Sequence, residues 1–283
     1  MSANIRIVSA EEITSTVAAL CIKANINVKE SIRSALCSAR DAEDSSLAIS
    51  VLDTLLENAN AAEREKLPIC QDTGMAVVFV SLGMNVHIDG DIELAINEGV
   101  RQGYRQGYFR NSVVSDPIKR ENTGDNTPAV IHYDLVPGNI VHITLAPKGF
   151  GSENMSALRM LNPSDGLGGV EDFIVETVKA AGPNPCPPVI VGAGIGGTME
   201  KAALLAKQAL LRDPGSVNDD PFWAEAEARL LERINALDIG PAGFGGRTTA
   251  LAVHIIAFPT HIAGLPVAIN IGCHATRHET AVI

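Results

Sequence analysis

The sequence has 283 residues, of which 46% are hydrophobic and 19% charged, and its formal net charge is −11 at pH 7. This length and composition are typical of a globular chain with a substantial core and exclude a disordered one. The negative charge argues against a nucleic-acid partner, whose phosphates it would repel. It does not exclude a small anionic substrate held by local cations.

The start of the chain and its cysteine content indicate a compartment. The first residues, MSANIRIVSAEE, lack the apolar core of a signal peptide, and no run of about twenty apolar residues predicts a membrane span. Five cysteines are an odd number, and a long chain without a signal peptide uses thiols as metal ligands, nucleophiles or core residues in a reducing environment. We therefore expect a cytoplasmic protein.

The first third of the sequence is predicted to be helical. Ser9-Ala10-Glu11-Glu12 has the Ser-x-x-Glu form of a capping box, which places side-chain acceptors over the first free amides of a helix. Helical spacing predicts further helices around Ile32 to Leu36 and from Leu47 to Ala61. Cys21 and Cys37 are interpreted as small buried hydrophobic residues of these helices. The buried faces are expected to contain Ile13, Val17, Leu20 and Cys21 in the first helix and Leu47, Val51, Leu55 and Leu56 in the third.

The rest of the chain mixes strands and helices. Val130 to Val136 and Ile140 to Leu145 flank Pro137-Gly138-Asn139, which predicts a β-hairpin. Strands are also expected at Met75 to Leu82, Thr249 to Ala257 and Pro266 to Ile271, and helices at Asp91 to Arg105, Val170 to Ala181, Met199 to Leu211 and Pro221 to Leu237. The fold class is therefore α/β (mixed α+β) in a single domain, with a helical part over about 1–66 and a mixed part over about 67–283.

The remaining three cysteines lie in turns. Cys70 occurs in Leu67-Pro68-Ile69-Cys70-Gln71-Asp72-Thr73-Gly74, Cys186 in Pro183-Asn184-Pro185-Cys186-Pro187-Pro188, and Cys273 in Ile271-Gly272-Cys273-His274. Turns on a rigid scaffold often carry functional groups. The spacing does not match a zinc motif, so unrelated thiols and a three-cysteine metal site both remain open. If the three thiols meet, they can hold three irons of a cubane cluster and leave the fourth iron open as a Lewis acid.

A glycine-rich segment supports a different hypothesis. Pro188 to Val191 precedes Gly192-Ala193-Gly194-Ile195-Gly196-Gly197 and a predicted helix, which matches the dinucleotide-binding fingerprint. A Rossmann unit requires a strand with an acidic residue after that helix, whereas Asp213-Pro214-Gly215-Ser216 and another helix follow here. A dinucleotide-binding oxidoreductase is therefore kept as an alternative. Gly243 to Thr248 is a second glycine-rich turn.

Four blocks of the sequence are distinctive when taken together. They are Pro68-Ile69-Cys70-Gln71-Asp72-Thr73-Gly74; Lys148-Gly149-Phe150-Gly151-Ser152-Glu153-Asn154; Cys186-Pro187-Pro188 with Gly194-Ile195-Gly196-Gly197-Thr198; and Gly272-Cys273-His274-Ala275. These blocks resemble the α subunit of two-subunit class I fumarases, which are iron–sulfur hydro-lyases. They occur in the family's order and span most of the chain.

The resemblance implies a role for each matched residue. Asp72 and His261 are implied to be catalytic, although from the residues alone Asp72 is a turn aspartate and His261 a structural histidine. Arg110 is implied to bind a carboxylate through its guanidinium group. The implied ligands of a 4Fe–4S cluster are Cys70, Cys186 and Cys273, and the implied substrate-binding residues are Gln71, Asp72, Arg110, Gly149, Gly151, Ser152 and Asn154.

The same resemblance implies an activity and a partner. The chain is expected to interconvert fumarate and (S)-malate, a reaction of the tricarboxylic acid cycle, with tartrate dehydratase as the alternative because it shares the cysteine framework. Single-chain relatives continue beyond the position that corresponds to Arg277 to Ile283. We therefore expect a separate β subunit to complete the site in a hetero-oligomer, and we expect no nucleic-acid or membrane partner.

Overall fold

The structure is a computed structural model, and it describes residues 5–283. Helices and mixed sheets alternate along the chain, which confirms the mixed α/β class. No helix among the described residues is both long and apolar enough to cross a membrane. The chain divides into two compact units: unit 1 holds 5–28, Ala59–Phe150 and Arg277–Ile283, and unit 2 holds Lys29–Asn58 and Gly151–Thr276.

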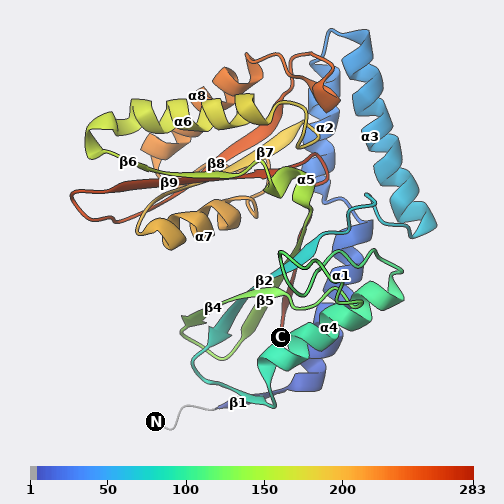
Figure 1. Cartoon of the computed structure of the whole chain (residues 1–283). Coiled ribbons are helices and arrows are strands. Elements are labelled where there is room, and N and C mark those ends of the chain that lie inside the picture. Colours follow the sequence, from blue (N-terminus) through green and yellow to red (C-terminus); the bar gives the residue numbers. More distant parts are fainter. Residues whose placement is uncertain (1–4) are drawn as a thin grey trace. The chain divides into compact units, whose positions relative to one another are not determined.

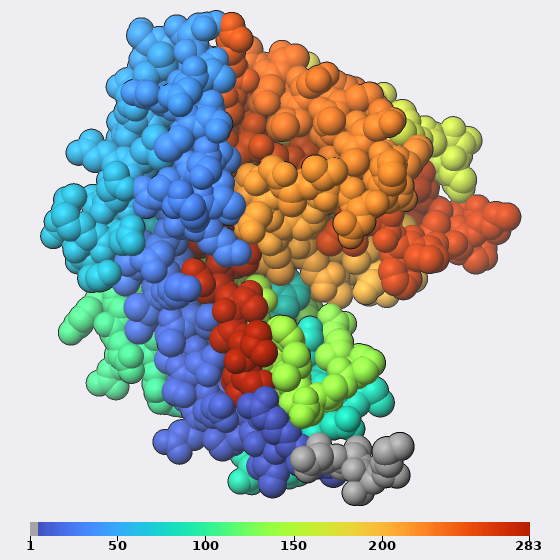
Figure 2. Space-filling model, turned by 180° about the vertical axis from the view of Figure 1, so that it is seen from behind, coloured from blue at the N-terminus to red at the C-terminus, as the bar shows by residue number. Residues whose placement is uncertain are grey.

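Unit 1 is a four-stranded sheet with two helices packed on one of its faces. The strand order is β10-β5-β2-β4, and a short parallel pair, β1 with β3, lies apart from it. The C-terminal strand β10 lies between α1 and β5 (Figure 2). The elements are β1 (Arg6–Ser9), α1 (Ala10–Ile26), β2 (Met75–Gly83), β3 (Val86–Asp89), α4 (Ile92–Gln106), β4 (Val130–Val136), β5 (Val141–Lys148) and β10 (Glu279–Val282).

Helix α1 begins where the capping box predicts. The Ser9 hydroxyl accepts a hydrogen bond from the Glu12 amide at 3.1 Å, and the predicted stripe that includes Cys21 is buried. Two glycines of α4 let the helices approach closely, because a Cβ atom at Gly103 would lie 2.6 Å from the Cys21 Cβ and one at Gly99 2.7 Å from the Val17 Cβ. Burial raises the pKa of the Cys21 thiol, as expected for a core residue.

The predicted hairpin of β4 and β5 is wrong. The two strands lie on opposite sides of β2, with β4 parallel to it and β5 antiparallel. Pro137-Gly138-Asn139 instead crosses the end of β2, where the Asn85 amide donates to the Gly138 carbonyl at 2.9 Å. The residues Pro137-Gly138-Asn139 determine that the chain reverses direction, but they do not determine that β4 and β5 pair with each other. The continuous apolar run of β2 is what requires the central position, because such a strand is buried on both faces.

Unit 2 contains the second sheet, with helices on both faces. Its order is β6-β9-β7-β8, with α6 and α8 on one face and α7 on the other (Figure 1). Its elements are α2 (Glu30–Asp41), β6 (Ala157–Leu161), α6 (Gly166–Ala181), β7 (Val189–Gly196), α7 (Met199–Ala209), α8 (Pro221–Asn235), β8 (Ala250–Phe258) and β9 (Leu265–Gly272). The chain passes between the units after Val28, within α3 (Ser46–Glu65), at α5 (Phe150–Glu153) and after Thr276.

Two details of the helical region differ from prediction. Cys37 on α2 is exposed, so its interpretation as a buried residue is wrong. Helix α3 buries Ala48 and Leu52, whereas the predicted Leu47 is 52% exposed. Cys37 follows Leu36 directly and therefore lies off the helix face that buries Ile32, Leu36 and Ala39. In α3 the buried face includes an alanine, a residue that a stripe of large apolar residues does not reveal.

The first glycine-rich segment is a strand and not the turn that was predicted. Gly192 and Gly194 lie within β7, where a Cβ atom at Gly194 would come within 2.0 Å of the Ala202 carbonyl oxygen on α7. These glycines therefore permit close packing of the helix on the sheet. Gly196 and Gly197, with φ of +91° and +68°, make the turn into α7. After α7 and α8 the chain enters β8, which pairs in parallel with β7.

Candidate functional site

The turn that carries Cys70 precedes β2 in unit 1. Asp72 is built into this turn through both oxygens of its carboxylate: Oδ1 accepts from the Gly74 amide at 3.0 Å, and Oδ2 accepts from the Phe150 amide at 2.9 Å. Gly149 lies against the same group, since a Cβ atom there would be 3.0 Å from Oδ2. The Cys70 turn and the start of the Gly149 loop, two predicted site segments, are thus joined by Asp72.

Three side chains hold the backbone of this turn through the carbonyls of residues 72–74. Arg277 Nη2 donates to the backbone carbonyl oxygen of Asp72 at 2.5 Å. The Tyr104 hydroxyl lies 2.6 Å from the Thr73 oxygen and 3.1 Å from the Gly74 oxygen, and Asn126 Nδ2 also donates to Gly74 at 3.1 Å. Arg277, Tyr104 and Asn126 are all buried. Three buried donors thus satisfy the carbonyl oxygens of this turn and favour a single backbone conformation.

Arg110 is tied to the same turn by its backbone. The Thr73 hydroxyl donates to the Arg110 carbonyl oxygen at 3.1 Å, while the arginine itself is exposed. The main chain of Arg110 is therefore fixed. An exposed guanidinium group on a fixed backbone is suited to gripping a carboxylate through two parallel hydrogen bonds.

Unit 2 brings the other two predicted ligand turns together. The backbone amide and the ring Nδ1 of His274, the residue after Cys273, both lie within hydrogen-bonding distance of the Cys186 carbonyl oxygen, at 3.2 and 3.0 Å. Cys186 has a φ of 56°, in the left-handed region. Cys186 is exposed and Cys273 is partly exposed.

The second glycine-rich turn supports the Cys186 segment. The Ala242 amide donates to the Pro187 carbonyl at 2.8 Å, and a Cβ atom at Gly243 would lie 2.3 Å from the Pro183 Cβ. The far end of this turn is held by Glu43, whose buried carboxylate accepts from the Arg247 amide at 2.8 Å. This turn therefore supports the backbone around Cys186.

The remaining predicted residues of the 149–154 loop lie in unit 2. Ser152 is buried, whereas Gly151 and Asn154 are exposed. Glu153 anchors the loop, because it accepts from Lys207 on α7 at 2.6 Å and from Asn270 on β9 at 2.9 Å. The loop is thereby attached to the strand that ends just before Cys273.

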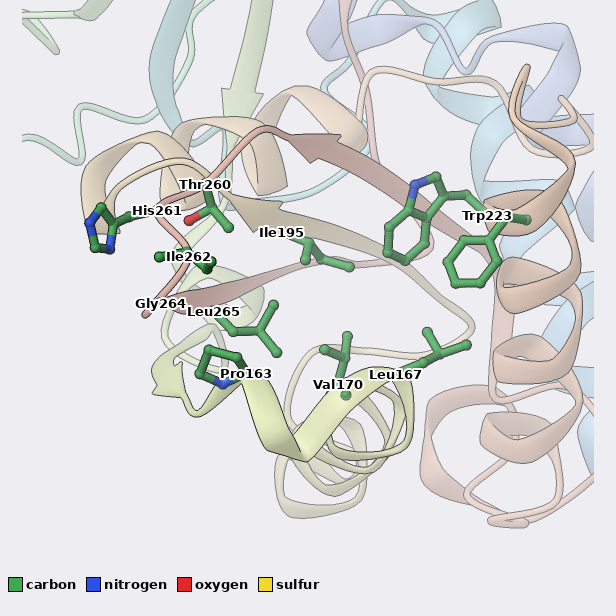
Figure 3. A pocket seen from close by; sticks show the side chains of 12 residues that line it. Pro163, Leu167, Val170, Ile195, Trp223, Thr260, His261, Ile262, Gly264 and Leu265 are labelled. Carbon is green, nitrogen blue, oxygen red and sulfur yellow. The ribbon is translucent and has the colours of Figure 1, made fainter.

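His261 does not lie near Cys273 within the chain. It precedes β9 and Cys273 follows it, so about 25 Å of strand separates them. His261 borders an apolar pocket of about 340 Å³, with Trp223 at its other side (Figure 3). Its Nδ1 accepts from the Ala263 amide at 3.2 Å. The pocket is lined by Pro163, Gly166, Leu167, Val170, Ile195, Phe222, Trp223, Thr260, His261, Ile262, Gly264 and Leu265.

The donor set can be compared with what an iron–sulfur cluster requires. Among residues 5–283, no three Cys, His, Asp or Glu side chains are gathered closely enough to hold a metal ion. Cys186 and Cys273 nevertheless stand at turn ends, and His274 links their backbones within unit 2. Thiols presented in this way suit cluster iron. Cys70 lies in unit 1.

Comparison with known proteins identifies the family. The family model described as Fumarate hydratase (Fumerase) matches residues 14–282. The chain belongs to the fumarate hydratase family. It is 42% identical over 273 residues to the Methanocaldococcus jannaschii protein named "Putative L(+)-tartrate dehydratase subunit alpha", covering 94% of this chain and 95% of that protein. It is 34% identical over 248 residues to the L(+)-tartrate dehydratase subunit alpha of Escherichia coli K12, covering 86% and 82%.

Membership of the fumarate hydratase family confirms that the chain is a hydro-lyase. Sequence reasoning missed four residues that shape this family member's candidate site. Tyr104, Asn126 and Glu43 gave no signal, because a buried hydrogen-bonding side chain has no characteristic spacing. Arg277 lies close in sequence to the Gly272-Cys273-His274-Ala275 block, but a cationic residue at that position does not by itself indicate a role. Its burial is the decisive observation, since arginine is seldom buried without a specific reason.

Proposed function

We propose that this chain is the α subunit of an iron–sulfur hydro-lyase that adds water to, or removes it from, a small dicarboxylic acid, with fumarate and (S)-malate as the substrate pair. The observation that carries the proposal is the double contact of His274 with the Cys186 carbonyl. It ties the turns of two thiols that family members are expected to use as ligands.

The proposed ligands are Cys70, Cys186 and Cys273, which would hold a 4Fe–4S cluster. When bound, such a cluster supplies a Lewis acid at the iron that no cysteine occupies. The fit rests on the chemistry of the donors: three thiols in turns, with two of the turns joined by His274. An open iron is sensitive to oxygen, which agrees with a reducing, cytoplasmic location.

Arg110 and the residues around Asp72 would bind the substrate. The exposed Arg110 guanidinium would take one carboxylate, and Gln71, which precedes Asp72 in the sequence, would also contact the substrate. Backbone amides of Gly149 and Gly151 and the side chains of Ser152 and Asn154 would contact the rest of the acid. Neutralising a carboxylate raises the acidity of the adjacent C–H, which is the proton that a base must remove.

Asp72 is proposed to take part in proton transfer as well as in the turn. Its oxygens accept from Gly74 and Phe150, but each carboxylate oxygen has a further lone pair that can accept a proton. Asp72→Asn tests the two roles. A general base should lose roughly 10²–10⁴-fold in kcat on substitution, whereas a purely structural turn residue should change stability and leave kcat within a small factor.

The relatives' names support a partner. Both are named as subunit alpha, and we propose that a β subunit supplies further carboxylate-binding residues. His261 is retained as a proposed catalytic residue, to be tested in the complete assembly because it lies far along β9 from Cys273. His261→Asn should then lower kcat in the assembly and leave the cluster content unchanged.

Tartrate is the second candidate substrate, since the relatives described above are named for it. The decisive experiment is anaerobic co-expression with a candidate β subunit, followed by iron and sulfide analysis and by assays with fumarate, malate and L(+)-tartrate. Cysteine-to-serine variants at 70, 186 and 273 should lose both iron and turnover. Full activity of the lone chain, or NAD binding without iron, would contradict the proposal.

A further inference from the structure

We propose that Tyr104 is a positioning residue for the candidate site: its hydroxyl group sets the placement of the Cys70 turn and of Arg110 together. This inference rests on the proposed function for its catalytic meaning, but its geometry is independent of that function. Tyr104 contacts neither Cys70 nor the Arg110 side chain in the interactions described above. It acts through the backbone oxygens of Thr73 and Gly74.

The hydroxyl group lies where two predicted site segments meet. It is 2.6 Å from the Thr73 oxygen and 3.1 Å from the Gly74 oxygen. Thr73 in turn donates through its own hydroxyl to the Arg110 carbonyl at 3.1 Å. One phenol therefore holds the residues that follow Asp72 and, through Thr73, the backbone that presents Arg110.

Packing leaves Tyr104 little freedom. The side chain is 1% exposed, and its ring meets the Phe109 ring edge-on with 5.6 Å between centroids. The preceding residue, Gly103, allows α4 to lie against α1, which fixes the base of the side chain. A buried aromatic side chain has only two torsions to fix, so it can place a hydroxyl group at low entropic cost.

Tyr104 stays neutral, so its hydroxyl group has a proton to donate in a hydrogen bond. Burial raises the pKa of its phenol above the ordinary value. The hydroxyl therefore keeps its proton at neutral pH. Both of its acceptors are backbone carbonyl oxygens, which need a donor when buried.

The test compares Tyr104→Phe with Tyr133→Phe. Tyr133 lies on β4 and is 44% exposed, so its variant removes a hydroxyl group outside the candidate site. The full-length chain, freed of iron, is treated with a thiol-alkylating reagent, and modification of each cysteine is followed by mass spectrometry. Because the turn loses the hydrogen bond that the single phenol proton shares between the Thr73 and Gly74 oxygens, Tyr104→Phe should accelerate alkylation of Cys70 by about tenfold. Cys21, buried in the core, should stay unmodified.

Selective acceleration at Cys70 supports the proposal. An unchanged Cys70 rate, or a rise at Cys21 in parallel with Cys70, would overturn it, because the second pattern reports general loosening of the fold. If Tyr104→Phe does not fold, Thr73→Val removes only the link to Arg110 and leaves both phenol acceptors in place. In the complete enzyme that variant should raise KM for the dicarboxylate more than it lowers kcat; the reverse would contradict the link. The alkylation result stands even if turnover is absent, so the two proposals fail separately.

Discussion

The turn of Cys70 is held by buried side chains, whereas the segment around Cys186 is held mainly by its own backbone. In unit 1, the backbone after Cys70 is fixed by buried side chains, those of Arg277, Tyr104 and Asn126. In unit 2, the segment around Cys186 is fixed mainly by backbone: prolines on both sides of the cysteine, a left-handed residue and hydrogen bonds between main-chain atoms. The two proposed ligand turns should therefore respond to different kinds of substitution.

This difference indicates where each turn can be adjusted. Removing one buried donor should loosen the Cys70 turn without altering its backbone preferences. The Cys186 segment should resist side-chain deletion and respond to changes in backbone conformation or in the glycine-rich turn that supports it.

The largest effect is expected at Gly243. A Cβ atom there would lie 2.3 Å from the Pro183 Cβ, and its φ of +81° disfavours any L side chain. Gly243→Ala should lower the free energy of unfolding by about 4 kcal/mol, through overpacking and backbone strain together. Urea denaturation measures this loss.

Gly245 provides the matched control for Gly243. Its φ is +78°, but no atom would lie closer than 4.0 Å to an added Cβ. Gly245→Ala should therefore show the backbone strain alone, about 1 kcal/mol. Equal losses at the two positions would mean that contact with Pro183 does not hold the Cys186 segment.

Acid should destabilise unit 2 before unit 1. Burial, helped by nearby Arg212, lowers the pKa of His254 from 6.5 to about 4, and Asp213 and Glu227 oppose this shift. The ring Nδ1 lies 3.2 Å from the Ala209 oxygen, and Nε2 is buried without a hydrogen-bond partner among the described residues. The unfolded chain binds a proton at His254 more readily than the folded chain does. The contribution of His254 to the free energy of unfolding is therefore fully present above pH 6.5, and about 3 kcal/mol of it is lost between pH 6.5 and 4.

Unit 1 has a different titrating group. Partial burial opposes the shift at Asp125, but hydrogen bonds from Thr127 and Arg101 outweigh it and lower the pKa from 3.8 to about 2. Its contribution is present above pH 3.8 and is lost between 3.8 and 2. Hydrogen exchange at pH 5 should show loss of protection in β8, and His254→Gln should flatten the stability profile between pH 6.5 and 4. A persistent slope in that variant would contradict the assignment.

The sequence predicted the bounds of helices and strands better than it predicted which strands pair with one another. The start of helix α1 was expected at its observed position, and helices α4, α6, α7 and α8 and strands β2, β8 and β9 were expected close to their observed bounds, because apolar periodicity and capping residues are local signals. The pairing of β4 and β5 was mispredicted because a turn sequence does not reveal that a third strand lies between its arms. Gly192 and Gly194 were mistaken for a turn because glycine occurs both in turns and where a helix packs closely on a strand.

In the candidate site, too, local features could be predicted from the sequence, whereas contacts between distant residues could not. Cysteines in proline- and glycine-rich turns can be recognised from the sequence, and His274 follows one of them directly. The contact between His274 and Cys186 joins residues 88 positions apart, and local patterns carry no information at that separation. The side chains that fix the Cys70 turn are distant in the same sense, since Tyr104 lies about thirty positions from its acceptors.

A moderate effect is expected at Asn126, where a side chain holds the backbone. The residue is fully buried, donates to Gly74 and accepts from the Ser112 amide at 2.7 Å. Its φ of 59° suits glycine, so Asn126→Gly removes both hydrogen bonds without adding strain. The free energy of unfolding should fall by about 2 kcal/mol, and Cys70 should be alkylated faster while Cys186 is not. Equal acceleration of both cysteines would remove the contrast between the turns.

The smallest effect is expected at a helix cap in each unit. Ser9 accepts from the Glu12 amide at the start of α1, and Asp220 accepts from the Phe222 amide at the start of α8. Ser9→Ala and Asp220→Ala should each cost about 1 kcal/mol, because one amide loses its partner and exposed caps act locally. Neither variant should change alkylation of Cys70 or Cys186, measured beside the urea midpoint. If Ser9→Ala accelerated Cys70 as much as Asn126→Gly, thiol reactivity would follow overall stability, and the buried donors would have no special part in holding the turn.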